Sequence, residues 1–252
     1  MGSPWWAAGT IPLADSDDRE AWLRVRRRYF TGSEAAVLLD RHEYTDLAAV
    51  LLEKRTGESD FDPDQDQVVQ GLLSEQFVAA YTERCWPGIK LDHCGQLLRD
   101  PGCERLAATP DYVTRDATAW GYPGPANVQL KFTGAWGAGD SRDIISCSAP
   151  AWPKPKPWVR PGSKTGRPTA WRWGDHGALP SYIWHQVQLE PVCLGVEHSF
   201  VVAYHRSMMP KYGTDQTQVR IYHVPRDQTV LDRLRVAAEA IGDPRQGVLD
   251  AD

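Results

Sequence analysis

Apolar and polar residues recur with two different periods along the chain, and these periods divide it into helices and strands. Helical spacing predicts helices at about 18–29, 44–54, 64–85, 181–194 and 228–241, and the capping-box pattern at 31–34 predicts one more that begins near Thr31. Strand patterns occur near 93–98, 104–107, 111–114, 127–133, 198–205 and 218–224. This order predicts an α/β (α+β) fold in which helices flank a mixed central sheet.

The longest predicted helix, at 64–85, has a clear apolar stripe. Val69, Leu73, Phe77 and Ala80 recur at helical spacing. We therefore expect these four side chains to face the core.

Residues 134–180 follow neither period. They are rich in Pro, Gly and Trp, and they form a stretch far longer than an ordinary connection. Loops of this length are usually functional or disordered. A chain of 252 residues suits one domain, so we expect a single domain over 1–252 with an insertion at about 134–180.

Charge is distributed unevenly. The net charge is −5, yet residues 144–174 contain no acidic residue and carry a charge of +6, which leaves −11 for the remainder. A basic strip on an acidic body indicates a local anion-binding surface. Tryptophans interleave with the basic residues, as expected of a surface that grips phosphates and stacks on unpaired bases. The DNA-binding candidates are Lys154, Lys156, Trp158, Arg160 and Lys164. A proline-stiffened loop that packs its tryptophans on the domain is the alternative.

Several classes of protein are disfavoured. No apolar run approaches the 18 residues of a membrane span, and the first residues lack the basic and apolar regions of a secretory signal, so we expect a cytoplasmic protein with no membrane partner. The five cysteines form no CxxC pair, which argues against a zinc module and a disulfide framework.

Two segments bring together residue types that suit phosphodiester chemistry. Asp111 follows Thr109-Pro110 at the start of a predicted strand. In the strand 127–133, Gln129 and Lys131 share a face because successive side chains alternate. Oxygen ligands of this kind suit Mg²⁺, and a lysine beside them can orient an attacking water. A turn proline, a capping aspartate and a surface lysine would give the same pattern by chance.

Five segments in consistent order strengthen the first interpretation. They resemble the motifs of the YqaJ-like viral recombinase family, the lambda-exonuclease branch of the PD-(D/E)xK nucleases, and span about residues 20–210. The segments are Trp22–Arg26 with Thr31–Glu34, Gly71–Glu75, Ala108–Asp111, Val128–Lys131 and Tyr182–Gln188.

The resemblance implies a restriction-endonuclease-like core and a metal centre. Glu75, Asp111 and Gln129 would bind Mg²⁺, with Mn²⁺ as a substitute. Lys131 would be the catalytic lysine, and Gln186 would support the site from the next helix. Without the resemblance, the helical pattern favours a solvated helix face for Glu75 and a helix-surface or sheet-packing position for Gln186.

The resemblance also implies a site for the 5′-phosphate of a DNA end, formed by Arg26, Ser33 and Thr109. Ser33 falls in the predicted first turn of a helix, where free N–H groups favour phosphate, and Arg26 can make a bidentate contact. The alternative for Ser33 is a role in helix capping alone.

Gln129 departs from the family pattern, which has glutamate at this position. An amide oxygen can bind Mg²⁺ but brings no charge, so the ligand charge falls from −3 to −2 and metal binding should weaken. Three explanations stay open: a natural variant with weaker metal binding, an engineered Glu→Gln substitution, or a protein that lost catalysis and kept DNA binding. If Gln129 is a ligand, Gln129→Glu should raise metal-dependent cleavage.

The sequence thus predicts a Mg²⁺-dependent exonuclease that degrades linear double-stranded DNA, with 5′→3′ polarity and action in phage-type recombination or DNA-end processing inferred from the resemblance. By the same analogy, a single-strand annealing protein and a homotrimer are expected partners. The alternatives are a DNA-end-binding protein with weak or lost cleavage and a related repair- or restriction-type endonuclease.

Overall fold

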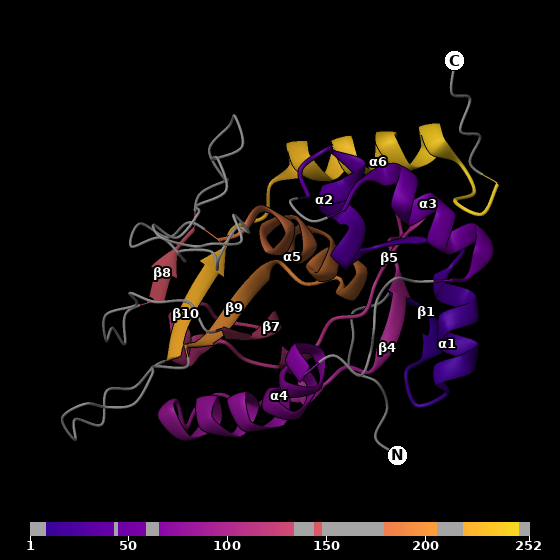
Figure 1. The fold of residues 1–252 in the computed structure, drawn as a ribbon. Helices are drawn as coiled ribbons and strands as arrows, with labels where there is room; N and C mark the ends of the chain where they lie inside the picture. Colours follow the sequence, from indigo (N-terminus) through magenta and orange to yellow (C-terminus); the bar gives the residue numbers. More distant parts are fainter. Residues whose placement is uncertain are drawn as a thin grey trace, which may run out of the picture.

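The computed structural model describes residues 9–42, 45–58, 66–133, 144–147, 179–205 and 219–246, and Figure 1 shows how their elements are arranged. The helices are α1 (Arg19–Arg26), α2 (Ala35–Leu38), α3 (Leu47–Thr56), α4 (Asp66–Cys85), α5 (Ser181–Leu194) and α6 (Gln228–Ile241), with 3₁₀ turns η1 (Gly32–Glu34) and η2 (Thr118–Trp120). The strands are β1 (Ile11–Asp15), β2 (Phe30–Thr31), β3 (Asp92–His93), β4 (Gln96–Arg99), β5 (Leu106–Ala108), β6 (Tyr112–Thr114), β7 (Ala126–Thr133), β8 (Ile144–Ser146), β9 (His198–His205) and β10 (Val219–Val224).

The strands form two mixed sheets. The larger has the order β3-β6-β7-β9-β10-β8, and the smaller has the order β1-β4-β5-β2. Within the larger sheet, β7 is antiparallel to β6 and parallel to β9, so that Gln129 lies beside Val201 and Lys131 beside Ala203. The expected mixed α+β fold is confirmed.

The larger sheet is covered on both faces, by α4 on one side and α5 on the other (Figure 1). Val128 and Leu130 of β7 pack in one apolar cluster with Val78 of α4. The alternate residues Asn127 and Gln129 hydrogen-bond to side chains of α5 instead. The period of the strand therefore turns a row of polar side chains toward α5.

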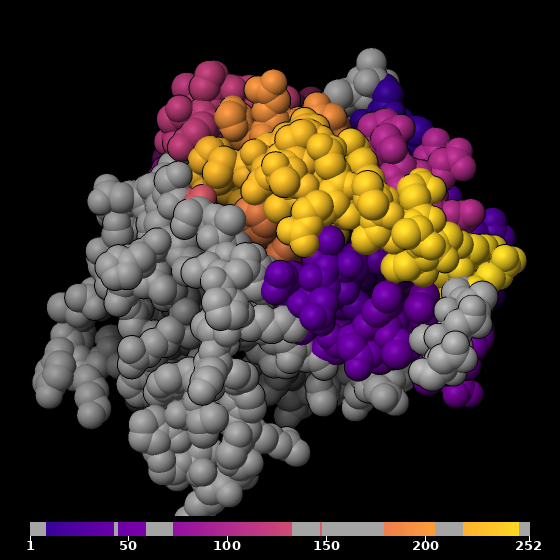
Figure 2. All heavy atoms as spheres, turned by 90° about the horizontal axis from the view of Figure 1, so that it is seen from above, coloured from indigo at the N-terminus to yellow at the C-terminus, as the bar shows by residue number. Residues whose placement is uncertain are grey.

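Helix α6 is held against the body of the protein by a buried ion pair. Arg235 donates to Asp100, which is fully buried, through Nε at 2.8 Å and Nη2 at 2.9 Å. Leu234 and Ala238 join the core cluster that also contains Leu38 and Leu51. Figure 2 shows α6, in yellow, lying against the indigo and violet segments that contain α2 and α3.

Helix α4 buries a different face from the one predicted. Leu73 and Phe77 are 74% and 48% exposed, and Ala80 is also exposed, whereas Val78 and Ala79 are buried. The buried face carries small and β-branched residues, which let the helix lie close to β7. Phe77 packs instead edge-on against Tyr204, with ring centroids 5.2 Å apart. The side chain of Val69 lies outside the described residues.

Other predictions agree more closely with the structure. Predicted and observed bounds coincide for α5, α6 and β9. Helix α1 ends three residues earlier than predicted, at Arg26, and the strands β1, β2 and β8 were not predicted.

All five cysteines are free. Within the described part of the chain, no helix has both the length and the apolar character needed to cross a bilayer.

Candidate active site

A cleft of about 290 Å³ gathers most of the residues singled out in the sequence. Its walls come from α1, η1, α4, α5 and the segments around β3 and β6. The predicted site residues that line it are Arg26, Ser33, Glu75, Thr109, Asp111 and Gln186. Gln129 and Lys131 are not part of its lining, but both interact with residues that are. The structure therefore brings the predicted metal and phosphate residues to one place.

Asp111 is held at the cleft by its neighbours on β7. Nε2 of Gln129 donates a hydrogen bond to Oδ2 of Asp111, and the backbone N–H of Leu130 donates to the same oxygen at 3.2 Å. Oε1 of Gln129 in turn accepts a hydrogen bond from Nε2 of Gln186 at 3.1 Å. Gln129 is 1% exposed, so it bridges Asp111 and α5 from below the cleft.

Negative charge is concentrated at the floor of the cleft. Burial and the nearby charge of Asp111 together raise the pKa of Glu75 to about 7, against the opposing effect of Lys131. Burial also raises the pKa of Asp111, and Lys131 again opposes the shift. Lys131 is thus close enough to both carboxylates to compensate part of their charge.

Arg26 forms the other side of the cleft together with two hydroxyl groups. Its Nη2 donates to Oγ of Ser33 at 3.0 Å and to Oγ1 of Thr31 at 3.3 Å. Its guanidinium also lies 5.1 Å from the ring centroid of Trp22. A partly exposed arginine beside two hydroxyls can bind a phosphate through several hydrogen bonds.

A buried ion pair lies behind Arg26. Nζ of Lys54 is 2.8 Å from Oε2 of Glu34, and Glu34 also accepts from the backbone N–H of Thr31 at 2.9 Å, as the predicted capping box requires. Burial alone would raise the pKa of Glu34, but the charges of Lys54 and Arg26 outweigh it and lower that pKa. Nη2 of Arg26 also lies 3.7 Å from Oε1 of Glu34, so Lys54 and Arg26 share this carboxylate.

The helix expected to begin near Thr31 is shorter than the sequence suggested. It consists of the single turn η1 followed by the four residues of α2. So short a helix has little macrodipole, so the dipole argument for phosphate binding at Ser33 does not hold. The case for an anion site here rests on the side chains of Arg26, Thr31 and Ser33.

The cleft side chains fit a divalent cation in kind and in charge. Glu75 and Asp111 are carboxylates that repel each other, and hard oxygen donors of this type bind Mg²⁺ and Mn²⁺. Among the described residues, no three Asp, Glu, His or Cys side chains already form a metal-binding cluster. Ligation by Gln129 would require its amide to turn, because its nitrogen faces Asp111. A cation held by these three side chains would therefore require side-chain movement in the cleft.

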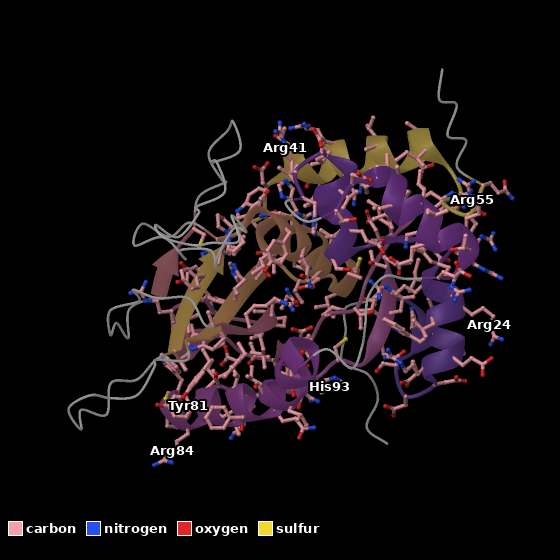
Figure 3. The ribbon with its side chains drawn as sticks, viewed as in Figure 1. Arg24, Arg41, Arg55, Tyr81, Arg84 and His93 are labelled. Atoms are coloured by element: carbon pink, nitrogen blue, oxygen red, sulfur yellow. The ribbon has the colours of Figure 1, made fainter. Side chains whose placement is uncertain are left out.

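Two titratable residues of the cleft lining, His93 and Glu190, were not singled out in the sequence. His93 packs edge-on against Tyr112, with ring centroids 5.4 Å apart, and its charge lowers the pKa of Asp111. Figure 3 shows His93 near the start of α4, whereas Arg24 and Arg55 point outward at the periphery. Glu190 lies one turn after Gln186 on α5. Neither belongs to a motif, so only the fold reveals them.

The predicted basic surface cannot be placed. The five candidates Lys154, Lys156, Trp158, Arg160 and Lys164 all fall in 148–178, which lies outside the described residues. Their role in DNA binding stays a prediction.

The resemblance seen in the motifs is matched by a family comparison. The sequence profile of the YqaJ-like viral recombinase domain matches residues 21–131, which include Arg26, Ser33, Glu75, Asp111 and Lys131. Over these residues the chain is similar to the YqaJ-like viral recombinase domain. Gln186 and the rest of α5 lie beyond the matched range. Among curated proteins, no sequence matches the chain significantly.

Solved structures resemble the chain over most of its length. LHK-Exo in complex with dAMP is 19% identical, with a TM-score of 0.53, and the match covers 88% of this chain and 89% of that one. The alkaline exonuclease LHK-Exo from Laribacter hongkongensis is 18% identical, with a TM-score of 0.52, and the match covers 88% of this chain and 89% of that one. A phage related exonuclease from Haemophilus somnus 129PT is 10% identical, with a TM-score of 0.53, and the match covers 84% of this chain and 91% of that one. At these identities the likeness establishes a shared fold.

Proposed function

We propose that this protein is a phage-type exonuclease that hydrolyses linear double-stranded DNA from its ends with the help of a divalent cation. The observation that carries the proposal is the meeting, in one cleft, of an Arg26–Ser33 anion site and the carboxylates of Glu75 and Asp111 beside Lys131. The domain match and the shared fold with exonucleases support the same reaction class.

Each side of the cleft has a distinct part in this reaction. Arg26, Ser33 and Thr109 would bind the terminal 5′-phosphate and so set the register of the strand. Lys131 would orient the attacking water and stabilise the negative charge that develops on the phosphorus oxygens. Mg²⁺ or Mn²⁺, held by Glu75 and Asp111 with Gln129, would polarise the scissile phosphate and lower the pKa of the water.

Several finer points rest on the family resemblance. They are the 5′→3′ direction, a place in phage-type recombination or DNA-end processing, a single-strand annealing partner and a homotrimeric assembly. A cytoplasmic location is expected from the sequence alone. Terminal phosphate binding by Arg26 agrees with the direction, because it places the 5′ end in the cleft.

The proposal is tested by digestion of three duplexes with Mg²⁺ and with Mn²⁺: linear DNA with 5′-phosphate, linear DNA with 5′-hydroxyl, and covalently closed circles. We expect nucleotides to be released fastest from the phosphorylated ends and no cut in the circles. Cleavage of closed circles would instead indicate an endonuclease of repair or restriction type. The absence of products with either metal would refute a nuclease.

A DNA-end-binding protein with weak or lost cleavage is the second candidate. One observation favours it: Gln129 is neutral and turns its amide nitrogen, not its oxygen, toward Asp111. Tight binding of phosphorylated ends without products in Mn²⁺ would select this candidate.

A further inference from the structure

Glu190 is a buried carboxylate at the wall of the cleft that no sequence motif includes. Its Oε1 accepts a hydrogen bond from Nε2 of Gln186 at 2.7 Å, and its Oε2 accepts one from Nδ2 of Asn127 at 2.9 Å. Both donors are neutral amides, and the side chain is 1% exposed. A charged group in such surroundings is costly unless a cation compensates it.

A chain of hydrogen bonds connects Glu190 with the proposed metal ligands. It runs from Asp111 through Gln129 and Gln186 to Glu190. The two ends also interact through their charges, because Asp111 adds to the effect of burial in raising the pKa of Glu190 to about 8, and Lys131 opposes it. Two carboxylates are thus joined by two neutral amides beside a single lysine.

The turn η1 packs beside Glu190. A Cβ on Gly32 would lie 3.6 Å from Oε1 of Glu190 and 3.4 Å from Cγ of Gln186, which is ordinary van der Waals contact. The turn that carries Ser33 and the part of α5 that carries Gln186 and Glu190 therefore line the same cleft.

We propose that Glu190 supplies to the cation site the negative charge that position 129 lacks. This inference rests on the proposed function, since it assumes that a divalent cation binds beside Asp111. Glu75, Asp111 and Glu190 together provide three carboxylates, the number that the family pattern would provide with glutamate at 129. Gln129 adds no charge of its own, and without a cation its amide bridges Asp111 and Gln186.

The test is calorimetric titration of Mn²⁺ alone into the metal-free full-length protein. We expect Glu190→Gln to weaken Mn²⁺ binding by about 10- to 100-fold, as loss of a supporting carboxylate does at other metal sites. The charge swap Gln129→Glu/Glu190→Gln should restore the affinity to within about threefold of wild type. Glu197→Gln, on an exposed glutamate, is the matched control and should leave the affinity unchanged.

The outcomes separate this inference from the proposed function. Unchanged affinity in Glu190→Gln, with wild type binding Mn²⁺, overturns the role of Glu190 and leaves the exonuclease intact. A wild-type protein that binds no Mn²⁺ overturns both. Thermal unfolding in EDTA checks that each variant folds. If Glu190→Gln does not fold, the double variant Gln129→Glu/Glu190→Gln decides, because it keeps the wild-type charge. Mn²⁺ affinity like that of wild type supports the proposal, and loss of Mn²⁺ binding overturns it.

Discussion

Gln129 and Asp111 are hydrogen-bonded partners, with Nε2 of the amide donating to Oδ2 of the carboxylate. Gln129→Glu would replace this donor by a second buried carboxylate. In EDTA, we expect the free energy of unfolding to fall by about 1–3 kcal/mol, because Asp111 loses a donor and gains a repelling charge. Mn²⁺ should reverse the loss, and cleavage at limiting Mn²⁺ should rise. Urea denaturation with and without Mn²⁺ measures the stability.

The matched control for this substitution is Gln76→Glu, at an exposed position of α4. It should change the stability little under either condition. Equal metal dependence of unfolding for the two variants would contradict a cation site beside Asp111.

Arg26 should determine the preference for phosphorylated ends. Its guanidinium is held by Ser33 and Thr31 at the cleft, so Arg26→Ala removes the positive charge of the proposed phosphate site. We expect the ratio of binding to 5′-phosphate over 5′-hydroxyl duplex to fall about tenfold, in keeping with loss of one charge-assisted contact. Arg24→Ala is the control, since Arg24 points outward (Figure 3). A wild-type ratio in both variants would contradict a contact between Arg26 and the terminal phosphate.

Lys54 should matter for stability far more than an ordinary surface lysine. Its side chain is 4% exposed and pairs with Glu34 at 2.8 Å, so Lys54→Met leaves a buried carboxylate with Arg26 alone. We expect the free energy of unfolding to fall by about 3 kcal/mol in Lys54→Met and to be partly recovered in Lys54→Met/Glu34→Gln. Lys90→Met breaks the exposed pair with Glu83 and should cost about 0–1 kcal/mol. Similar losses in the two single variants would argue against this role.

His185 makes stability depend on pH. Burial lowers its pKa to about 4, against about 6.5 in an unfolded chain. Between these values the unfolded state binds a proton that the folded state does not, so stability falls as pH drops from 6.5 to 4. We expect His185→Gln to make this decline shallower by about 1–3 kcal/mol in urea titrations. His42→Gln is the control. If the free energy of unfolding of His185→Gln depends on pH as steeply as that of wild type, other groups dominate this pH dependence.

The sequence predicted most of the fold because its long elements have strong local signals. Helix α5 begins after Pro180 and ends before Gly195, and α6 ends before Gly242, so their bounds could be read directly. The buried face of α4 could not, because helical spacing shows that a stripe exists but not which of two stripes meets the sheet. Strand β2 has two residues, too few for any period.

In the cleft, too, local sequence patterns identify some residues and only the fold identifies others. Asp111 and Lys131 belong to a spaced motif and were found in the sequence, whereas Glu190 and His93 have no such pattern. Glu190 reaches the cleft because α5 crosses the polar face of β7, at the level of Asn127. That juxtaposition joins residues 63 positions apart, and it exists only once the chain is folded.

The most direct test of the whole account is Mn²⁺-dependent digestion of 5′-phosphorylated linear duplex by wild type and by Lys131→Met, with thermal unfolding as the check on folding. We predict that wild type releases nucleotides, that EDTA stops the reaction, and that Lys131→Met binds the duplex but cleaves at least about 100-fold more slowly. Equal rates for the two proteins would contradict the placement of the reaction at this cleft.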